Sequence, residues 1–243
     1  MSDQATTEGT LLGGRVHHAQ PRHGHRTSLE PVLLAASIPA RPGQRVLEGG
    51  TGAGAALLCL AARVPAITGF GLERDPTMAD LARANVAANG FAQLRIETCD
   101  LTALQPGERF DHAFANPPWH APSGTASPDP VREAARRATP SLIASWAAAL
   151  AGALRPRGTL TLILGADHVA TGLAALAAAR CGSPTIFPLW PKPGRPARLV
   201  LLQARRGGRG PARLLPGMAL HTPVGPFTAE AEAILRDGAA LNL

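Results

Sequence analysis

The amino-acid sequence predicts an α/β fold, with a doubly wound and mostly parallel sheet of seven strands in the Rossmann-like arrangement. Strand-like and helix-like segments alternate along most of the chain, which is the pattern of a parallel sheet covered by helices. A glycine-rich run at residues 49–54 joins the first of these strands to a helix. Two strand-like segments with only a short turn at 191–194 between them close the pattern, which predicts one antiparallel strand at the end of the sheet.

The elements follow from apolar spacing and from the residues that end each segment. Pro39 stops the first helix, Asp75-Pro76 gives the third helix an N-cap and a first-turn proline, and Gly90 is its C-cap. Asp167 is expected to cap the last of these helices. In chain order we expect a helix at 28–38, a strand at 45–48, a helix at 55–63, a strand at 67–73, a helix at 75–89, strands at 93–99 and 110–115, a helix at 139–154, a strand at 158–164, a helix at 167–180, and strands at 185–190 and 197–203.

Composition limits the class of protein. The chain has 243 residues, is 45% hydrophobic and carries 24 basic against 17 acidic residues, a net charge of +7. Those values suit one folded domain of ordinary size. All basic residues but Lys192 are arginines, whose forked donors match phosphate, although a compositional bias of the genome explains them equally well. No apolar run reaches the roughly 18 residues of a membrane span, and the first ten residues do not resemble a signal peptide, so we expect a cytoplasmic protein.

The glycine-rich loop is the first candidate site. It reads Glu48-Gly49-Gly50-Thr51-Gly52-Ala53-Gly54, between a strand and a helix, where a doubly wound sheet binds its ligand. Glycines there let the backbone turn sharply and let a ligand lie against it. The loop, with Glu73 about 20 residues further on, also satisfies the looser dinucleotide fingerprint. A nicotinamide-dependent oxidoreductase therefore remains an alternative.

Acidic residues lie at the ends of three successive strands: Glu48, Glu73 and Asp100. Three consecutive strand ends of this kind can hold the amino-acid part, the ribose and the adenine of S-adenosylmethionine. The competing interpretation is that such residues cap the helices that follow them.

The sequence Asn116-Pro117-Pro118-Trp119 follows the fourth strand directly. Two successive prolines remove two backbone donors and fix two φ angles, so the carbonyls there point in set directions. If the Asn116 side-chain oxygen and the Pro117 carbonyl accept the two hydrogens of a planar amine, its nitrogen can aim a lone pair at a methyl group. Trp119 offers a flat face for a base removed from its stack. A proline-rich turn after a core strand is the structural alternative.

Taken together, these motifs resemble those of the class I S-adenosylmethionine-dependent methyltransferases. More closely, the chain resembles the bacterial family of tRNA1(Val) adenine-N6 methyltransferases, which modify the adenosine just 3′ of the anticodon. The similarity extends over nearly the whole chain. It is seen in residues 20–34, the glycine loop, residues 116–119, residues 195–200 and Leu220-His221.

The resemblance implies a role for each motif residue. Gly50, Gly52 and Gly54 would line S-adenosylmethionine, Glu73 would bind its ribose hydroxyls and Asp100 would face its adenine. Asn116 with Pro117 would orient the target amine, beside Trp119. Arg26 and Thr27 would close the cofactor pocket from the N-terminal side. The family pattern is broken at Glu48 and Glu30, which replace aspartates, and at Trp119, where tyrosine or phenylalanine is commoner.

The resemblance also implies an organisation and a partner. We expect an N-terminal extension and lead-in helix at 1–40, a methyltransferase catalytic domain at 41–205 and a basic C-terminal extension at 206–243 packed on that domain. An arginine-rich surface would bind RNA, most simply tRNA, through its phosphates. We expect no metal and no membrane, and the oligomeric state is open. The arginines in question are Arg132, Arg136, Arg137, Arg205, Arg206, Arg209 and Arg213.

Other substrates and classes stay open at this point. Enzymes with an Asn-Pro-Pro-aromatic sequence also methylate a glutamine of peptide release factors or the exocyclic amine of guanine in ribosomal RNA. A non-catalytic RNA-binding protein that has kept the fold is a further alternative, because two acids of the pattern are substituted.

Overall fold

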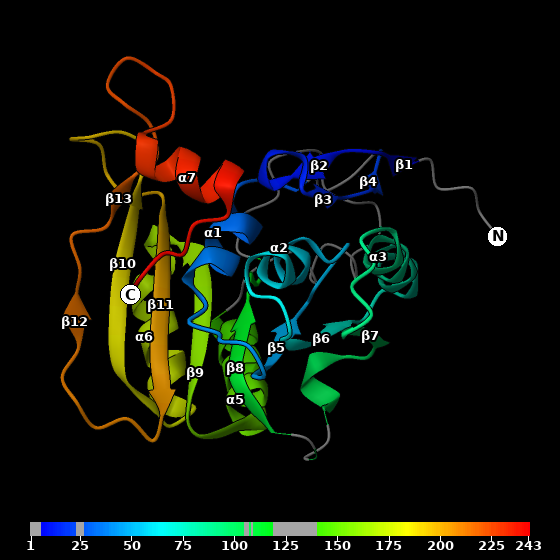
Figure 1. Ribbon diagram of the computed structural model, residues 1–243. Coiled ribbons are helices and arrows are strands. Elements are labelled where there is room, and N and C mark those ends of the chain that lie inside the picture. Colours follow the sequence, from blue (N-terminus) through cyan, green and yellow to red (C-terminus); the bar gives the residue numbers. More distant parts are fainter. Residues whose placement is uncertain (1–5, 23–26, 105–106, 108, 119–139) are drawn as a thin grey trace, which may run out of the picture.

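The computed structural model describes residues 6–22, 27–104, 107, 109–118 and 140–243. Its centre is one mixed sheet with helices on both faces (Figure 1). The predicted alternation of strands and helices is confirmed. The site residues Arg26 and Trp119 lie outside the described residues, as do Arg132, Arg136 and Arg137.

The strands of the large sheet run in the order β12-β10-β11-β9-β8-β5-β6-β7, with β13 also paired to β10. From β9 to β7 every neighbouring pair is parallel, so the carboxyl ends of these five strands share one edge of the sheet. We call this edge the carboxyl edge and the opposite one the amino edge. The strands are β5 (Arg45–Gly49), β6 (Thr68–Glu73), β7 (Leu94–Thr98), β8 (Phe110–Ala115), β9 (Leu154–Gly165), β10 (Cys181–Trp190), β11 (Leu199–Arg206), β12 (Arg213–Leu214) and β13 (Met218–Ala219).

The sequence predicted an antiparallel strand at the end of the sheet, and this position is wrong. β11 is inserted between β9 and β10 and is antiparallel to both. Its first four residues, 199–202, are apolar and buried, so the strand suits a position with a neighbour on each side. β11 therefore begins at the carboxyl edge and ends at the amino edge, which places the basic residues that follow it.

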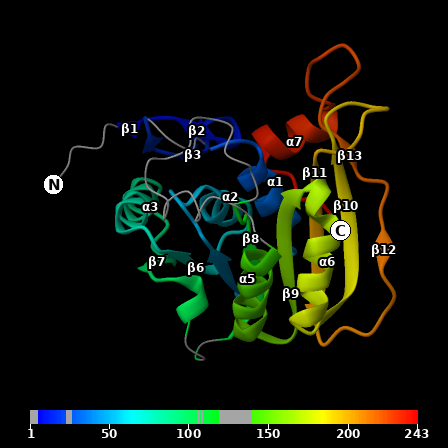
Figure 2. The same ribbon diagram turned by 180° about the vertical axis from the view of Figure 1, so that it is seen from behind.

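Two apolar cores lie on the two faces of the sheet. Helices α1, α2 and α3 pack on one face, and α5 and α6 on the other (Figures 1 and 2). Successive strand residues alternate between the cores: Val46 belongs to the first and Leu47 to the second. Helix α7 packs against α1. The helices are α1 (Glu30–Ser37), α2 (Ala55–Arg63), α3 (Pro76–Ala88), α5 (Pro140–Ala153), α6 (Val169–Ala178) and α7 (Ala229–Asp237).

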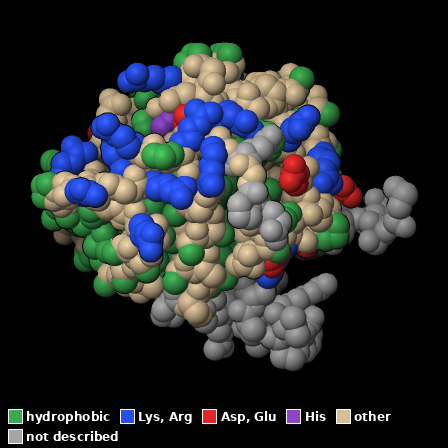
Figure 3. All heavy atoms as spheres, turned by 90° about the horizontal axis from the view of Figure 1, so that it is seen from below, with side chains coloured by type: hydrophobic (Ala, Val, Ile, Leu, Met, Phe, Trp, Pro, Cys, Tyr) green, Lys and Arg blue, Asp and Glu red, His purple; other side chains and the backbone are tan. Residues whose placement is uncertain are grey.

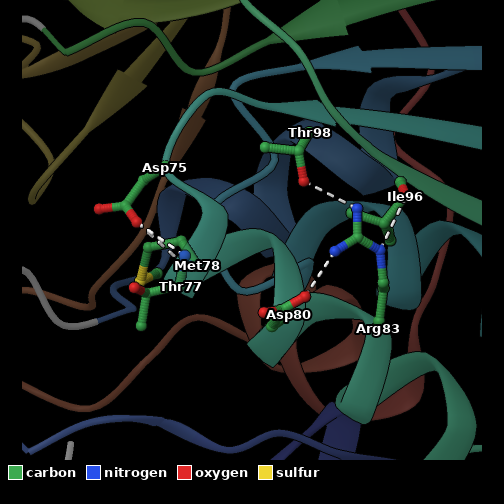
Figure 4. A network of polar contacts seen from close by, with 7 residues as sticks. All are labelled: Asp75, Thr77, Met78, Asp80, Arg83, Ile96 and Thr98. Atoms are coloured by element: carbon green, nitrogen blue, oxygen red, sulfur yellow. Dashed lines mark hydrogen bonds and ion pairs between the residues drawn. The ribbon is translucent and has the colours of Figure 1, made fainter. Parts of the chain in front are cut away.

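Side-chain capping agrees with the sequence at α3 and differs at α6. Asp75 accepts hydrogen bonds from the amides of Thr77 and Met78, as predicted (Figure 4). Asp167 lies in a short 3-10 turn before α6 and contacts His168 Nδ1 at 2.8 Å, with no bond to the helix amides. The prediction that Asp167 caps this helix is wrong, because the chain makes one extra turn between β9 and α6.

Helix α3 is held to the last strand of the sheet by one arginine. Arg83 donates to the Ile96 carbonyl at 3.1 Å and to Thr98 Oγ1 at 2.8 Å, both on β7, and to Asp80 at 2.6 Å (Figure 4). The two bonds to β7 hold α3 beside that strand.

The N-terminal segment forms two small antiparallel pairs above the helices α2 and α3 (Figure 1). β1 (Thr6–Thr7) pairs with β4 (Gln20–Pro21), and β2 (Thr10–Leu11) pairs with β3 (Val16–His17). Within the described ranges, no helix has the length and apolar character needed to cross a membrane.

Candidate cofactor and amine site

The glycine loop turns sharply at the carboxyl edge. Gly50, Gly52 and Gly54 all have positive φ angles, of 66°, 55° and 91°, which favour glycine. The Thr51 amide donates to the Leu72 carbonyl at 3.0 Å, so the loop is tied to the end of β6. A side chain at Gly50 would collide with the Trp146 ring of α5. Beside Gly52 the space is open, because a Cβ added there would meet only a methyl group of Met78, at 3.9 Å.

Glu48 lies beneath this loop and not on its surface. Its side chain is 4% exposed, and its Oε2 accepts hydrogen bonds from Thr51 Oγ1 at 2.6 Å and from the Leu57 amide at 3.1 Å. Burial raises the pKa of this carboxyl from 4.5 to about 8, against the lowering effect of its two donors. Glu48 therefore links the loop to the first turn of α2. A contact with a cofactor ammonium group stays a prediction.

Glu73 ends β6 and faces the loop from the neighbouring strand. Its Oε2 accepts the Gly52 amide at 2.9 Å and its Oε1 accepts the Asp75 amide at 2.9 Å. Each carboxylate oxygen has a second acceptor position, so two hydroxyl groups of a ribose can still donate to it. The half-buried carboxylate and the open space beside Gly52 fit a nucleoside of the kind the sequence predicts.

Asp100 follows β7 at the same edge and is exposed. Its Oδ1 accepts both the Thr102 hydroxyl, at 2.6 Å, and the Thr102 amide, at 2.8 Å. These two bonds lower the pKa of the carboxyl. Asp100 is thus the N-cap of the short turn Leu101–Ala103, which is the competing interpretation from the sequence. The cap uses Oδ1, so Oδ2 of Asp100 can still face an adenine, as the sequence predicts.

Asn116 and Pro117 leave the sheet beside the glycine loop. Gly49 on β5 and Ala115 on β8 are partners in the parallel register, so the next residues, Gly50 and Asn116, start from adjacent strands about 5 Å apart. Asn116 is half-buried and Pro117 is buried. The parallel sheet thus brings two motifs 66 residues apart to one corner, at the crevice beyond the strand ends where such folds bind ligands.

Thr27 is connected to the glycine loop through two residues that the sequence did not indicate. Its Oγ1 lies 2.8 Å from His18 Nε2, and His18 Nδ1 lies 3.3 Å from the Asn85 amide nitrogen. Asn85, on α3, also donates to the Ala53 carbonyl of the loop at 2.9 Å. Burial lowers the pKa of His18, which favours the neutral ring that such contacts need. The N-terminal segment is therefore linked to the glycine loop through Asn85.

One signal in the sequence could have identified Asn85. It lies one helical turn after Ala82, on the buried face of α3 that also includes Ala79. An amide at such a position needs polar partners from another segment.

The C-terminal arginines are placed away from this site. Arg205 pairs with Thr159 near the start of β9, and Arg206 pairs with Cys181 at the start of β10. Both lie at the amino edge, whereas Asn116 lies at the carboxyl edge. Arg213 is further along, on β12, and donates to Thr185 at 2.9 Å. The sequence did not indicate this separation.

Comparison with known proteins gives consistent matches. The family described as "Methyltransferase domain" matches residues 46–141. A tRNA1(Val) (adenine(37)-N6)-methyltransferase of Actinobacillus succinogenes is 30% identical over 158 residues, covering 63% of this chain and 66% of that protein. A protein of the same name from Porphyromonas gingivalis strain W83 is 36% identical, covering 59% and 60%. The first of these matches thus spans about two thirds of its relative's length, and others span as little as 51%.

Solved structures show the same fold. A predicted O-methyltransferase from Agrobacterium tumefaciens superposes with a TM-score of 0.71 at 26% identity, covering 88% of this chain and 98% of that one. An S-adenosylmethionine-dependent O-methyltransferase from Thermotoga maritima has a TM-score of 0.55 at 18% identity, covering 78% and 69%. The similarity in sequence covers less of the chain than the motifs implied, whereas the similarity in fold covers most of it.

Proposed function

We propose that this chain, which belongs to the class I S-adenosylmethionine-dependent methyltransferases, methylates the N6 amine of an adenine in RNA. The substrate we propose is an anticodon-loop adenosine of tRNA, modified in the cytoplasm. The membership removes the nicotinamide-dependent oxidoreductase that the glycine loop left open. S-adenosylmethionine supplies an electrophilic methyl group, and the rest of the chemistry falls to this chain's residues.

The proposal rests on the register pair Gly49 and Ala115. Because these residues are neighbours across β5 and β8, the Asn116-Pro117 corner opens next to the glycine loop. The residues that suit the cofactor are those of the loop, Glu73 and Asp100. Glu73 and Asp100 each keep acceptor capacity beyond the bonds already described, and the loop leaves open space at Gly52.

At this corner the chain has acceptors for a planar NH2 group. In our proposal the Asn116 side-chain oxygen and the Pro117 carbonyl each accept one amine hydrogen. The nitrogen lone pair, otherwise delocalised into the ring, is then directed toward the methyl group. Such a site works by position and electrostatics, without a strong base.

The adenine of tRNA is favoured by the relatives. Two of them, 30% and 36% identical to this chain, carry the name tRNA1(Val) (adenine(37)-N6)-methyltransferase. A base in a loop also costs less to extrude than a base in a duplex. Trp119, outside the described residues, remains our candidate for stacking on it.

The decisive experiment is incubation of the protein with methyl-labelled cofactor and total bacterial RNA, followed by digestion to nucleosides. We expect the label in N6-methyladenosine from the tRNA fraction. Label in methylated guanine, in a ribose oxygen, or only in a release factor added as a second substrate would overturn the adenine assignment.

The role of Asn116 is tested separately. Asn116→Ala should abolish methyl transfer while S-adenosylhomocysteine still binds with nearly unchanged affinity by calorimetry. Asn242→Ala, the same substitution at an exposed position near the C-terminus, is the matched control and should keep full activity. Loss of transfer and of cofactor binding together in Asn116→Ala would mean that Asn116 belongs to the cofactor site.

A further inference from the structure

The amino edge of the sheet carries a large basic surface. We define the amino-edge arginine surface by nine arginines located at the starts of β5, β8, β9 and β10 and at the end of β11. They come from segments far apart in the sequence that the sheet brings to one end of the molecule. Basic side chains spread widely over this face (Figure 3). The nine are Arg41, Arg45, Arg109, Arg155, Arg157, Arg180, Arg205, Arg206 and Arg209.

Four of these arginines have structural roles. Arg45 lies over the rings of Phe70 and Phe110, at 5.2 and 5.4 Å from their centroids. Arg109 and Arg206 both donate to the Gly152 carbonyl in the last turn of α5, where a cation is also favoured by the helix dipole. Arg155 pairs with Asp111 at 2.7 Å.

The other five have no such partner. Among the described residues, the side chains of Arg41, Arg157, Arg180, Arg205 and Arg209 take part in no hydrogen bond or ion pair, and all five are exposed. The acidic residue in the described part of this edge is Asp111. Its carboxylate already accepts hydrogen bonds from the Arg155 side chain and from the Arg45 amide. Five like charges therefore face solvent without compensation, which costs folding energy through mutual repulsion.

We propose that the amino-edge arginine surface binds phosphates of the RNA substrate, as a second contact remote from the methyl-transfer site. This inference rests on the proposed function for the identity of the partner. Guanidinium groups match phosphate in geometry as well as charge. Contacts of this kind give affinity without sequence preference and fix the position of the RNA.

The second contact sets a minimum size for a tightly bound substrate. β9 runs from Arg157 near the amino edge to Gly165 at the carboxyl edge, eight residues at about 3.3 Å each, or roughly 26 Å. A folded tRNA can extend that far around the protein. A short oligonucleotide that carries only the target adenosine cannot, so it should depend on the carboxyl edge alone.

The test compares two triple variants that remove the same charge. The first combines Arg157→Gln, Arg205→Gln and Arg209→Gln on the surface. The control combines Arg195→Gln, Arg198→Gln and Arg236→Gln, three exposed arginines away from the amino edge. Binding of whole tRNA and of a single-stranded pentanucleotide is measured by fluorescence anisotropy between 50 and 200 mM salt, with circular dichroism as a check on folding.

We expect the surface variant to bind tRNA at least tenfold more weakly than wild type at 50 mM salt, with the pentanucleotide unaffected. Three lost phosphate contacts should reduce the slope of log K against log salt by about 2 to 3. The control should match wild type within about twofold. If the triple variant does not fold, the three single variants replace it, each with a slope reduced by about 1.

Equal tRNA affinity and equal salt slope in wild type and surface variant would overturn the inference. The same holds if the control loses as much affinity as the surface variant, because the effect would then be one of net charge. Failure of the proposed function looks different: wild type would transfer no methyl group to RNA although tRNA binding still depended on the amino-edge arginine surface.

Discussion

Asn85 of α3 makes two hydrogen bonds to the backbone of Ala19. Its Oδ1 accepts the Ala19 amide hydrogen at 2.9 Å, and its Nδ2 donates to the Ala19 carbonyl at 2.9 Å. One turn later, Asn89 makes the same pair of bonds to His17, at 2.8 and 2.7 Å. Residues four apart on a helix rise by about 6 Å, and residues two apart on a strand by about 6.6 Å. The two asparagines therefore act as a strand edge for the N-terminal segment.

Replacement of Asn85 should release this segment. In Asn85→Ala the buried amide groups of Ala19 and the carbonyl of Ala53 lose their partner, which should cost about 1–3 kcal/mol in the free energy of unfolding. Affinity for S-adenosylhomocysteine should fall as well, because Asn85 also binds the glycine loop. Urea unfolding and calorimetry measure the two effects.

Asn89→Ala is the matched control for that variant. Asn89 makes the same bonds to the backbone but does not contact the loop. It should lose less stability and keep its affinity for S-adenosylhomocysteine. Equal loss of affinity in both variants would show that anchoring of the segment, and not the loop contact, supports the cofactor site.

Gly50→Ala tests the geometry of the loop. The substitution adds a positive-φ penalty of about 1–2 kcal/mol and a collision with Trp146. Gly43→Ala carries the same φ penalty, since its φ is 82°, but a Cβ there meets nothing within 4 Å. We expect Gly50→Ala to be destabilised by about 1–3 kcal/mol more than Gly43→Ala, as measured by urea unfolding. Equal losses would mean that the Trp146 ring moves aside freely.

The buried carboxyl of Glu48 should make stability depend on pH. Its pKa is 4.5 in the reference state and about 8 in the folded protein, so over this interval the folded state binds more protons than the unfolded state. The contribution of Glu48 to the free energy of unfolding is therefore complete below pH 4.5 and is lost as the pH rises to 8.

Glu48→Gln keeps a neutral group of the same shape at every pH. The stability of wild type relative to this variant should fall between pH 5 and pH 8, by at most about 4 kcal/mol. Urea unfolding of both proteins at pH 5, 6, 7 and 8 measures it. A constant difference across that range would show that the carboxyl is ionised in the fold.

Removal of the Glu73 carboxylate should weaken cofactor binding. Glu73→Ala removes the acceptor of the Gly52 amide and the proposed acceptor of the ribose hydroxyls, so the Kd of S-adenosylhomocysteine should rise by at least tenfold. Glu97→Ala, on the neighbouring strand at the register partner of Leu72, is the control and should bind normally. Calorimetry measures the Kd of S-adenosylhomocysteine for both variants. Unchanged binding by Glu73→Ala would show that Glu73 does not belong to the cofactor site.

The sequence alone was sufficient for features with local causes. Apolar spacing located the strands and helices, Asp75-Pro76 started α3, and the glycine run lies where a loop with three positive φ angles requires it. The identity of the domain also followed from local motifs, since the glycine loop and Asn116-Pro117 are each a continuous stretch of chain. Several features that depend on contacts between particular side chains or on strand order were missed or misplaced.

Three features that the sequence did not indicate were decided by the tertiary structure. The insertion of β11 between β9 and β10 places Arg205 and Arg206 at the end of the sheet opposite Asn116, because strand direction is a property of the assembled sheet. Asn85 meets the N-terminal segment across 66 residues of sequence. Glu48 is covered by its own loop and helix. Local chemistry therefore determined what the chain contains, and long-range packing decided which of those groups meet, because burial and pairing energies are realised only between segments brought together by folding.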